Sequence, residues 1–284
     1  MNLIEQIVNG LVLGSGYALI AIGWTVLLGA ARMVNFAHGQ LYMLGAFLAW
    51  AAMQHLGVSY FVAVPLAVLA LGFLGVVLQG AMLRLVMQQN LTSLMIVTLG
   101  FGYVIQGVAP QVFGANPESL RSPLEKASIH LGDIWFTWQD VTILCGTLVL
   151  FLCLWLVLNR TRVGAIVRSV AEDPKLAQLF GINATLVYVG VFVFECTAVA
   201  LGAGLVAPRS PILTSMGFDE VILTFVVVVL GGIGSVTGSL IAGLGLGMFT
   251  ALFGALVSPA YTTAAAFLLL LAVLVMRPQG LAAK

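Results

Sequence analysis

Residues 186–206 read LVYVGVFVFECTAVALGAGLV, and this stretch decides the class of fold. Its one charged residue, Glu195, lies near the middle of an otherwise apolar run. A hydrocarbon layer about 30 Å thick is crossed by roughly 20 apolar residues in a helix. Inside that layer the backbone must satisfy its own hydrogen bonds, which a helix does. The stretch therefore predicts a transmembrane helix.

Similar apolar runs recur along the whole chain. Of its 284 residues, 61% are hydrophobic and 7% are charged, and the mean hydropathy is +1.14. A soluble core of this size could not hide so much apolar surface from water. We predict an all-α fold: one polytopic integral membrane helical bundle over residues 1–284, with about 8–9 transmembrane or re-entrant helices. The candidate segments are 3–29, 40–55, 60–83, 92–112, 140–158, 186–206, 221–233, 237–255 and 260–276.

Three of these segments are short and are interrupted or bounded by glycine. They are 40–55, 221–233 and 237–255, and each is a candidate for a broken or re-entrant helix. The first segment has no basic residues before it and no Ala-x-Ala cleavage site after it, so we interpret it as a retained helix.

Basic residues predict which loops face the cytoplasm. Arg160, Arg162, Arg168 and Lys175 cluster in the loop at 159–185. Arg84 and Arg277 fall on the same side if the segments alternate, and so does Arg32. The loop at 113–139, with charges of both signs, then faces outward together with the N-terminus. A re-entrant segment at 33–55 would reverse the side of the N-terminus.

The composition and motifs argue against several functions. The net charge is +1 and the basic residues form no cluster suited to nucleic acid, so we expect no nucleic-acid partner. The three cysteines and three histidines have no metal-ligand spacing, and we expect neither a metal nor a cofactor. No phosphate-binding loop and no nucleophile motif of an enzyme is present. We therefore expect no enzyme activity, and any ATP hydrolysis would belong to another subunit.

The sequence of the predicted cytoplasmic loop predicts a short helix and includes the residues that cap both of its ends. Asp173 is a good N-cap, Pro174 suits the first helical position and Gly181 suits the stop. The apolar stripe that this helix carries consists of Leu176, Leu179 and Phe180. This stripe must be buried on something: either the bundle or the membrane surface, or a partner protein in the cytoplasm.

Polar residues also occur where a membrane segment would need a reason for them. Asn35, His38, Gln40 and Tyr42 lie between two apolar runs, where they could line a pathway, cap helix ends or form a turn. Glu195 is costly within hydrocarbon and should face protein or water. It could contribute to a pathway, or it could be a neutral carboxyl that forms hydrogen bonds within the protein.

Four motifs, in order along the chain, resemble those of the branched-chain amino acid ABC transporter permeases. They are Gly14-Ser-Gly-Tyr-Ala-Leu-Ile-Ala-Ile-Gly23 with Val34-Asn-Phe-Ala-His-Gly39, then Ala171-Glu-Asp-Pro-Lys-Leu-Ala-Gln-Leu-Phe-Gly-Ile-Asn183, Val229-Leu-Gly-Gly-Ile-Gly-Ser-Val-Thr-Gly238 and Leu274-Val-Met-Arg-Pro-Gln-Gly-Leu281. The resemblance is strongest to the leucine/isoleucine/valine type of permease.

The resemblance implies an assembly in a bacterial inner membrane. A second, homologous permease subunit would complete a heterodimer around a pathway, two ATPase subunits would bind the cytoplasmic loops, and a periplasmic binding protein would deliver the solute. The ATPase-coupling residues would be Glu172, Asp173, Pro174, Leu176, Leu179, Phe180 and Gly181. The candidate pathway residues remain Asn35, His38, Gln40, Tyr42 and Glu195.

Some residues depart from the family pattern and leave the solute open. Members often carry Glu at the position of Gln40, Lys-Ala-Phe near Ile222–Phe225, and a small apolar residue at the position of Glu195. The solute would be a branched-chain amino acid or a related small polar molecule such as urea, an amide or a small carboxylate. The competing hypothesis is an ion- or proton-coupled secondary transporter that uses Glu195.

Overall fold

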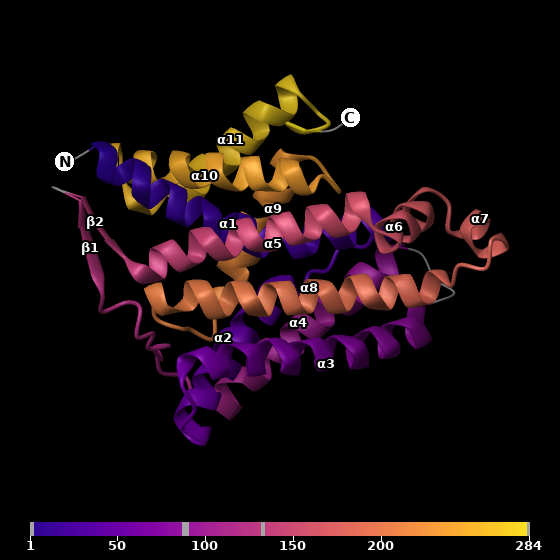
Figure 1. Ribbon diagram of the computed structural model, residues 1–284, viewed down its shortest axis with the longest axis horizontal. Coiled ribbons are helices and arrows are strands. Elements are labelled where there is room, and N and C mark those ends of the chain that lie inside the picture. The colour runs from indigo at the N-terminus through magenta and orange to yellow at the C-terminus, as the bar shows by residue number, and fades with distance from the viewer. Residues whose placement is uncertain (1–2, 87–90, 132–133, 283–284) are drawn as a thin grey trace.

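The computed structural model describes residues 3–86, 91–131 and 134–282. In these ranges the chain forms a bundle of long helices (Figure 1). The helices are α1 Leu3–Ala31, α2 His38–Leu56, α3 Tyr60–Val86, α4 Leu91–Phe113, α5 Trp138–Arg160, α8 Ala184–Val206, α9 Met216–Gly231, α10 Val236–Leu256 and α11 Thr262–Met276. Smaller elements are the antiparallel strands β1 Ser128–Leu131 and β2 Ile134–Thr137, the helices α6 Arg162–Glu172 and α7 Pro174–Leu179, and the 3-10 turns η1 Ala207–Arg209 and η2 Pro259–Tyr261.

The prediction of an all-α membrane bundle is confirmed. Within the described residues, seven segments are long and apolar enough to cross a membrane, and they contain α1, α3, α4, α5, α8, α10 and α11. The two remaining long helices, α2 and α9, correspond to two of the three segments that glycine interrupts or bounds. The third such segment became α10, which is a full-length span.

Helices α2 and α9 begin next to each other, away from the ends of the bundle. A Cβ placed on Gly39, in the first turn of α2, would lie 1.8 Å from the carbonyl oxygen of Gly217 in the first turn of α9. Only glycine permits backbones to approach so closely. The non-helical segments 32–37 and 210–215 lead the chain back to these starting points.

The helices pair in a pattern that suggests two inverted halves. Helix α1 packs along α10 much as α8 packs along α3, and α1 also crosses α8. Helix α2 contacts α3, α4 and α8, whereas α9 contacts α10, α11 and α1. Such repeats commonly place discontinuous helices at the centre of a transport protein. Here the two helices that occupy matching places in the halves, α2 and α9, contact each other.

The two loops predicted to face opposite sides of the membrane lie at opposite ends of the bundle. Figure 1 shows the β1–β2 hairpin and the N-terminus at one end, with α6 and α7 at the other. The C-terminal segment folds back onto the end of α9, where the Leu281 N–H donates to the Leu230 carbonyl at 2.8 Å. This arrangement agrees with the predicted topology, including an N-terminus opposite the 159–185 loop.

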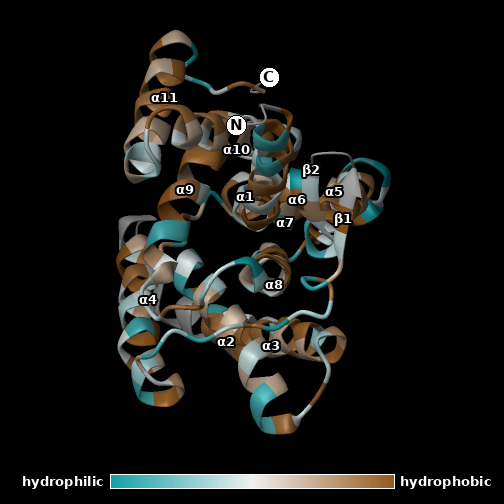
Figure 2. Cartoon of the chain, turned by 90° about the vertical axis from the view of Figure 1, so that its left-hand side faces the viewer, coloured by the Kyte–Doolittle hydropathy of each residue, from teal (hydrophilic) through white to brown (hydrophobic). Residues whose placement is uncertain are grey.

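The sides of the bundle are apolar outside as well as inside, as a lipid-facing protein requires. Trp24, Phe47 and Phe192 fill the core. Leu69 and Phe73 of α3 are 70% and 73% exposed. Figure 2 shows hydrophobic residues on most of the helices, including those at the outside of the bundle.

Candidate functional sites

Three of the candidate pathway residues meet at the start of α2. Asn35 donates through Nδ2 to both carboxyl oxygens of Glu195, at 3.1 and 3.2 Å. His38 Nδ1 lies 2.9 Å from Glu195 Oε1. All three side chains are buried, with at most 1% of each residue exposed. The cluster therefore joins the non-helical segment before α2 to the middle of α8.

Neighbouring groups hold this cluster in place. The Asn35 Oδ1 atom accepts from the Ala37 N–H at 3.0 Å and so shapes the turn into α2. The indole of Trp24 stacks on the His38 ring, with ring centroids 4.9 Å apart and planes 16° from parallel. Glu195 is thus enclosed by protein and faces no lipid. Its carboxyl forms hydrogen bonds within the protein, to Asn35 and His38.

Gln40 and Tyr42 lie on α2 but do not touch Glu195. Gln40 Nε2 donates to Gln106 Oε1 on α4 at 3.4 Å. Tyr42 is 2% exposed and lies on α2, which packs against α9, and a different acid, Glu220 of α9, influences it electrostatically. The sequence prediction began the α9 segment at residue 221 and so left out Asp219 and Glu220. Two adjacent acids directly before an apolar run were the signal.

Replacing Glu195 with alanine should destabilise the protein more than replacing it with the neutral residue glutamine. In Glu195→Ala, Asn35 and His38 lose their buried partner, and each unsatisfied group costs about 1–3 kcal/mol. Glu195→Gln keeps an acceptor at the same place. We expect a lower melting temperature in detergent for the alanine variant and a nearly normal one for the glutamine variant. Equal losses in both would mean that the charge itself is required.

At the other end, α6 and α7 form a capped unit after α5. The predicted caps of α7 are confirmed: Asp173 Oδ1 accepts from the N–H groups of Lys175 and Leu176 at 2.9 and 3.0 Å. Pro174 is the first helical residue, and Gly181 follows the helix with φ +79°. Glu172 is exposed where α6 ends. These caps fix a helix of six residues that would not be stable alone.

The apolar stripe of α7 is not buried on the bundle. Leu176, Leu179 and Phe180 are 52%, 83% and 79% exposed. Ala177, on the opposite side, anchors the helix in a small cluster with Val170 and Ala184. Of the alternatives open from the sequence, packing back onto the bundle is wrong, because α7 projects beyond the ends of α5 and α8 (Figure 1).

Helix α6 was not predicted from the sequence, although the spacing of its apolar residues indicates a helix. Val163, Ile166, Val167 and Val170 follow the three- and four-residue spacing of a helix. Thr161 supplies the N-cap, where its hydroxyl accepts from the Gly164 N–H at 3.4 Å. With α6, the loop at 159–185 contains two helices, α6 and α7, which together form a two-helix platform.

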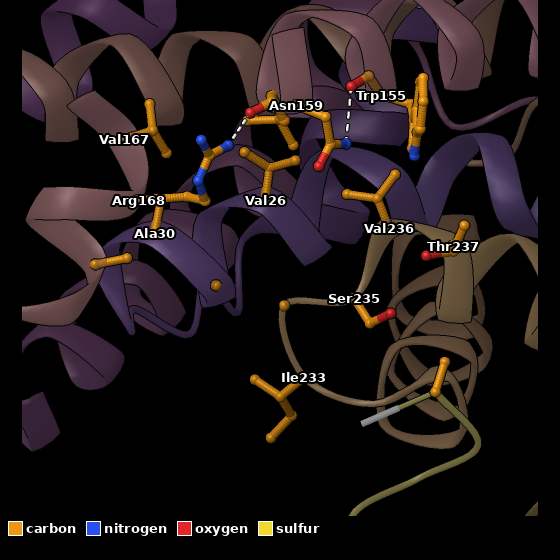
Figure 3. Close-up of a pocket in the computed structure, with 15 residues that line it drawn as sticks. Val26, Ala30, Trp155, Asn159, Val167, Arg168, Ile233, Ser235, Val236 and Thr237 are labelled. Atoms are coloured by element: carbon orange, nitrogen blue, oxygen red, sulfur yellow. Dashed lines mark hydrogen bonds between the residues drawn. The ribbon is translucent and has the colours of Figure 1, made fainter. Parts of the chain in front are cut away.

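A cavity of about 590 Å³ lies next to this platform. Figure 3 shows Arg168 of α6 on one side of it, and Ser235 and Thr237 at the start of α10 on the other. Arg168 donates to the Leu158 carbonyl at the end of α5. The Gly-Gly motif supplies the turn between α9 and α10, with φ +96° at Gly232 and +81° at Gly234. The second and third sequence motifs therefore meet at this cavity.

A family model described as "Branched-chain amino acid transport system / permease component" matches residues 6–274. The chain belongs to this permease family. The permease BraD of Pseudomonas aeruginosa, a high-affinity branched-chain amino acid transport system protein, is 30% identical over 98% of this chain and 95% of its own length. The corresponding LivH permease of Salmonella typhimurium is 31% identical over 98% and 94%.

More distant similarities support the same architecture. The fructose import permease protein FrcC of Rhizobium meliloti is 30% identical over 55% of this chain and 46% of its own length. Among solved structures, PsaBC from Streptococcus pneumoniae in complex with Fab gives a TM-score of 0.51 with 12% identity. That match covers 98% of this permease and 93% of that chain. At this identity it supports the fold alone. The chain is thus a multi-pass membrane permease.

Proposed function

We propose that this permease is a transmembrane subunit of an ATP-driven ABC importer for branched-chain amino acids or a related small polar solute. The family match supports the permease role, and the names of BraD and LivH support the solute class. The structural observation that most strongly supports this proposal is the exposed apolar stripe on the capped helix α7, formed by Leu176, Leu179 and Phe180. Three large apolar side chains exposed at the end of a bundle are typical of an interaction site, and we assign that site to a protein partner.

The partner we propose for α7 is an ATPase subunit on the cytoplasmic side. Glu172, Asp173, Pro174 and Gly181 shape the coupling segment within the 159–185 loop, and the exposed stripe supplies the contact. The complete assembly would contain a second permease subunit as a heterodimer, two ATPase subunits and a periplasmic binding protein. It would lie in a bacterial inner membrane, with the 113–139 loop outward as part of a single permease domain.

Within the bundle, we propose that Asn35, His38 and Glu195 position the start of α2 for transport. Their hydrogen bonds to one another support a positioning role over direct contact with the solute. The secondary-transporter hypothesis needs an acid that water can reach, and the enclosure of Glu195 weakens it. Gln40 and Tyr42 remain candidates for the pathway because they share α2 and its start next to α9.

Purification tests the proposed assembly. A tagged permease, expressed with the ATPase and second permease subunits of the same transport system, should retain both through size-exclusion chromatography in detergent. A secondary transporter would purify without them. Recovery of the folded permease alone, from cells that contain all of the subunits, would contradict the proposal.

Labelling tests its orientation. In a variant with Cys145, Cys153 and Cys196 replaced by alanine, a cysteine at position 179 should react with a membrane-impermeant maleimide only after the membrane is permeabilised. A cysteine at position 125 in the outward loop should react in intact right-side-out vesicles. The reverse pattern would overturn the topology and the coupling role of α7.

A further inference from the structure

Asp219 and Glu220 place two carboxyl groups deep within the membrane bundle. They lie in the first turn of α9, next to the contact of Gly217 with Gly39. The neighbouring Phe218 packs on Tyr103, near the middle of α4, with ring centroids 5.9 Å apart. The start of α9 is therefore near mid-depth rather than at either surface.

These acids lack compensating charge. No cation lies within 4.0 Å of either carboxyl in the described parts of the chain, where the ion pairs are His38–Glu195 and Arg209–Asp140. Leu223 occupies the position one turn after Asp219. Asp219 is nevertheless exposed on the surface of the chain. An exposed carboxylate at this depth is too costly to face lipid, so this side of α9 must face a watery pathway or another subunit.

Glu220 extends the same site inward. Its Oε2 atom is buried and has no hydrogen-bond partner among the residues that the structure describes. Helix α9 packs against α1, which carries Tyr17, and against α2, which carries Tyr42. The charge of Glu220 acts on both phenols. Tyr42 is itself 2% exposed, whereas the Tyr17 hydroxyl interacts with Thr250 of α10. Within the described ranges, an acceptor without a donor, Glu220 Oε2, and two aromatic rings thus come from α9 and the two helices packed against it.

We propose that Asp219 and Glu220, with Tyr17 and Tyr42, bind the ammonium group of the solute as it passes this depth. A primary ammonium carries three donors and a positive charge, which suit two carboxylates, and aromatic rings also attract cations. The inference rests on the proposed function and deepens it, since it selects an amino acid over urea, an amide or a simple carboxylate. It places the pathway along the exposed side of the start of α9.

Charge-selective labelling tests the site without relying on transport. In the variant without native cysteines, Ser215→Cys places a thiol one turn before Asp219. A cationic methanethiosulfonate reagent should modify it faster than an anionic reagent of matched size. The combined change of Asp219→Asn and Glu220→Gln should lower this rate ratio about tenfold. Glu125→Gln, in the outward loop, is the control and should leave the ratio unchanged.

Uptake of L-leucine by the complete reconstituted transporter provides the second readout. Glu220→Gln should lower uptake at least tenfold, while the melting temperature and ATP hydrolysis stay close to those of the wild type. A loss of stability equal to the loss of uptake, or an unchanged rate ratio, would overturn the site. If the wild type itself shows no ATP-dependent uptake, the proposed function fails, and the labelling ratio still decides whether the acids attract cations.

Discussion

Gly247→Val should prevent the permease from folding. A Cβ at position 247 would lie 2.1 Å from the backbone nitrogen of Gly14 and 2.2 Å from its Cα. Backbone atoms cannot rotate away as a side chain can, so α1 and α10 would have to separate along their shared interface. Ordinary overpacking costs about 1–3 kcal/mol and occasionally more, and we expect a backbone clash between two helices to exceed that range. The measurement is the yield of monodisperse protein by fluorescence-detected size-exclusion chromatography.

Gly245→Val is the matched control for this variant. Gly245 lies on the same helix, two positions earlier, and a Cβ there would meet no atom within 4 Å. Both variants replace glycine with the same β-branched residue, so their helix propensities change alike. Normal yield for position 245 and almost none for position 247 is the expected result. Equal yields would show that the α1–α10 contact is not as close as described.

Leu179→Asp should uncouple ATP hydrolysis from transport. Leu179 is the most exposed member of the α7 stripe, at 83%, so a change there costs the isolated permease little. At a partner interface the same change would bury a charge without compensation. We expect the variant to insert and fold normally but to lose at least tenfold in ATP-dependent uptake, measured with reconstituted transporter.

Leu179→Met provides the control, because it keeps an apolar side chain of similar volume. It should retain most of the uptake. Wild-type uptake by the aspartate variant would remove α7 from the coupling mechanism. A failure of the aspartate variant to reach the membrane would contradict the surface position of Leu179.

Apolar run length was enough to predict most of the spans. Residues 186–206 became the greater part of α8 because a long apolar segment has few alternatives in a membrane. The same rule could not locate the starts of α2 and α9, because close contact between Gly39 and Gly217 depends on segments far apart in the sequence. The glycines in the sequence indicated that such helices are short or interrupted. They did not indicate that the starts of α2 and α9 lie in contact with each other.

The caps of α7 could be predicted from the sequence for a different reason. Asp173, Pro174 and Gly181 act on their immediate neighbours, so local sequence determines them. Whether Leu179 is buried depends on the surrounding fold, and the sequence left that open. Glu195 shows the same limit: its cost in a membrane was evident, but its partners Asn35 and His38 come from another part of the chain.

Transport through this permease is expected to depend on ATP hydrolysis by partner subunits. Proteoliposomes with the complete transporter should be loaded with ATP on the side of α7 and given the binding protein and labelled L-leucine on the other side. L-leucine should accumulate only when ATP is present, and it should still accumulate after a protonophore and sodium and potassium ionophores dissipate the ion gradients. Accumulation driven by an ion gradient in the absence of ATP would contradict this dependence on ATP.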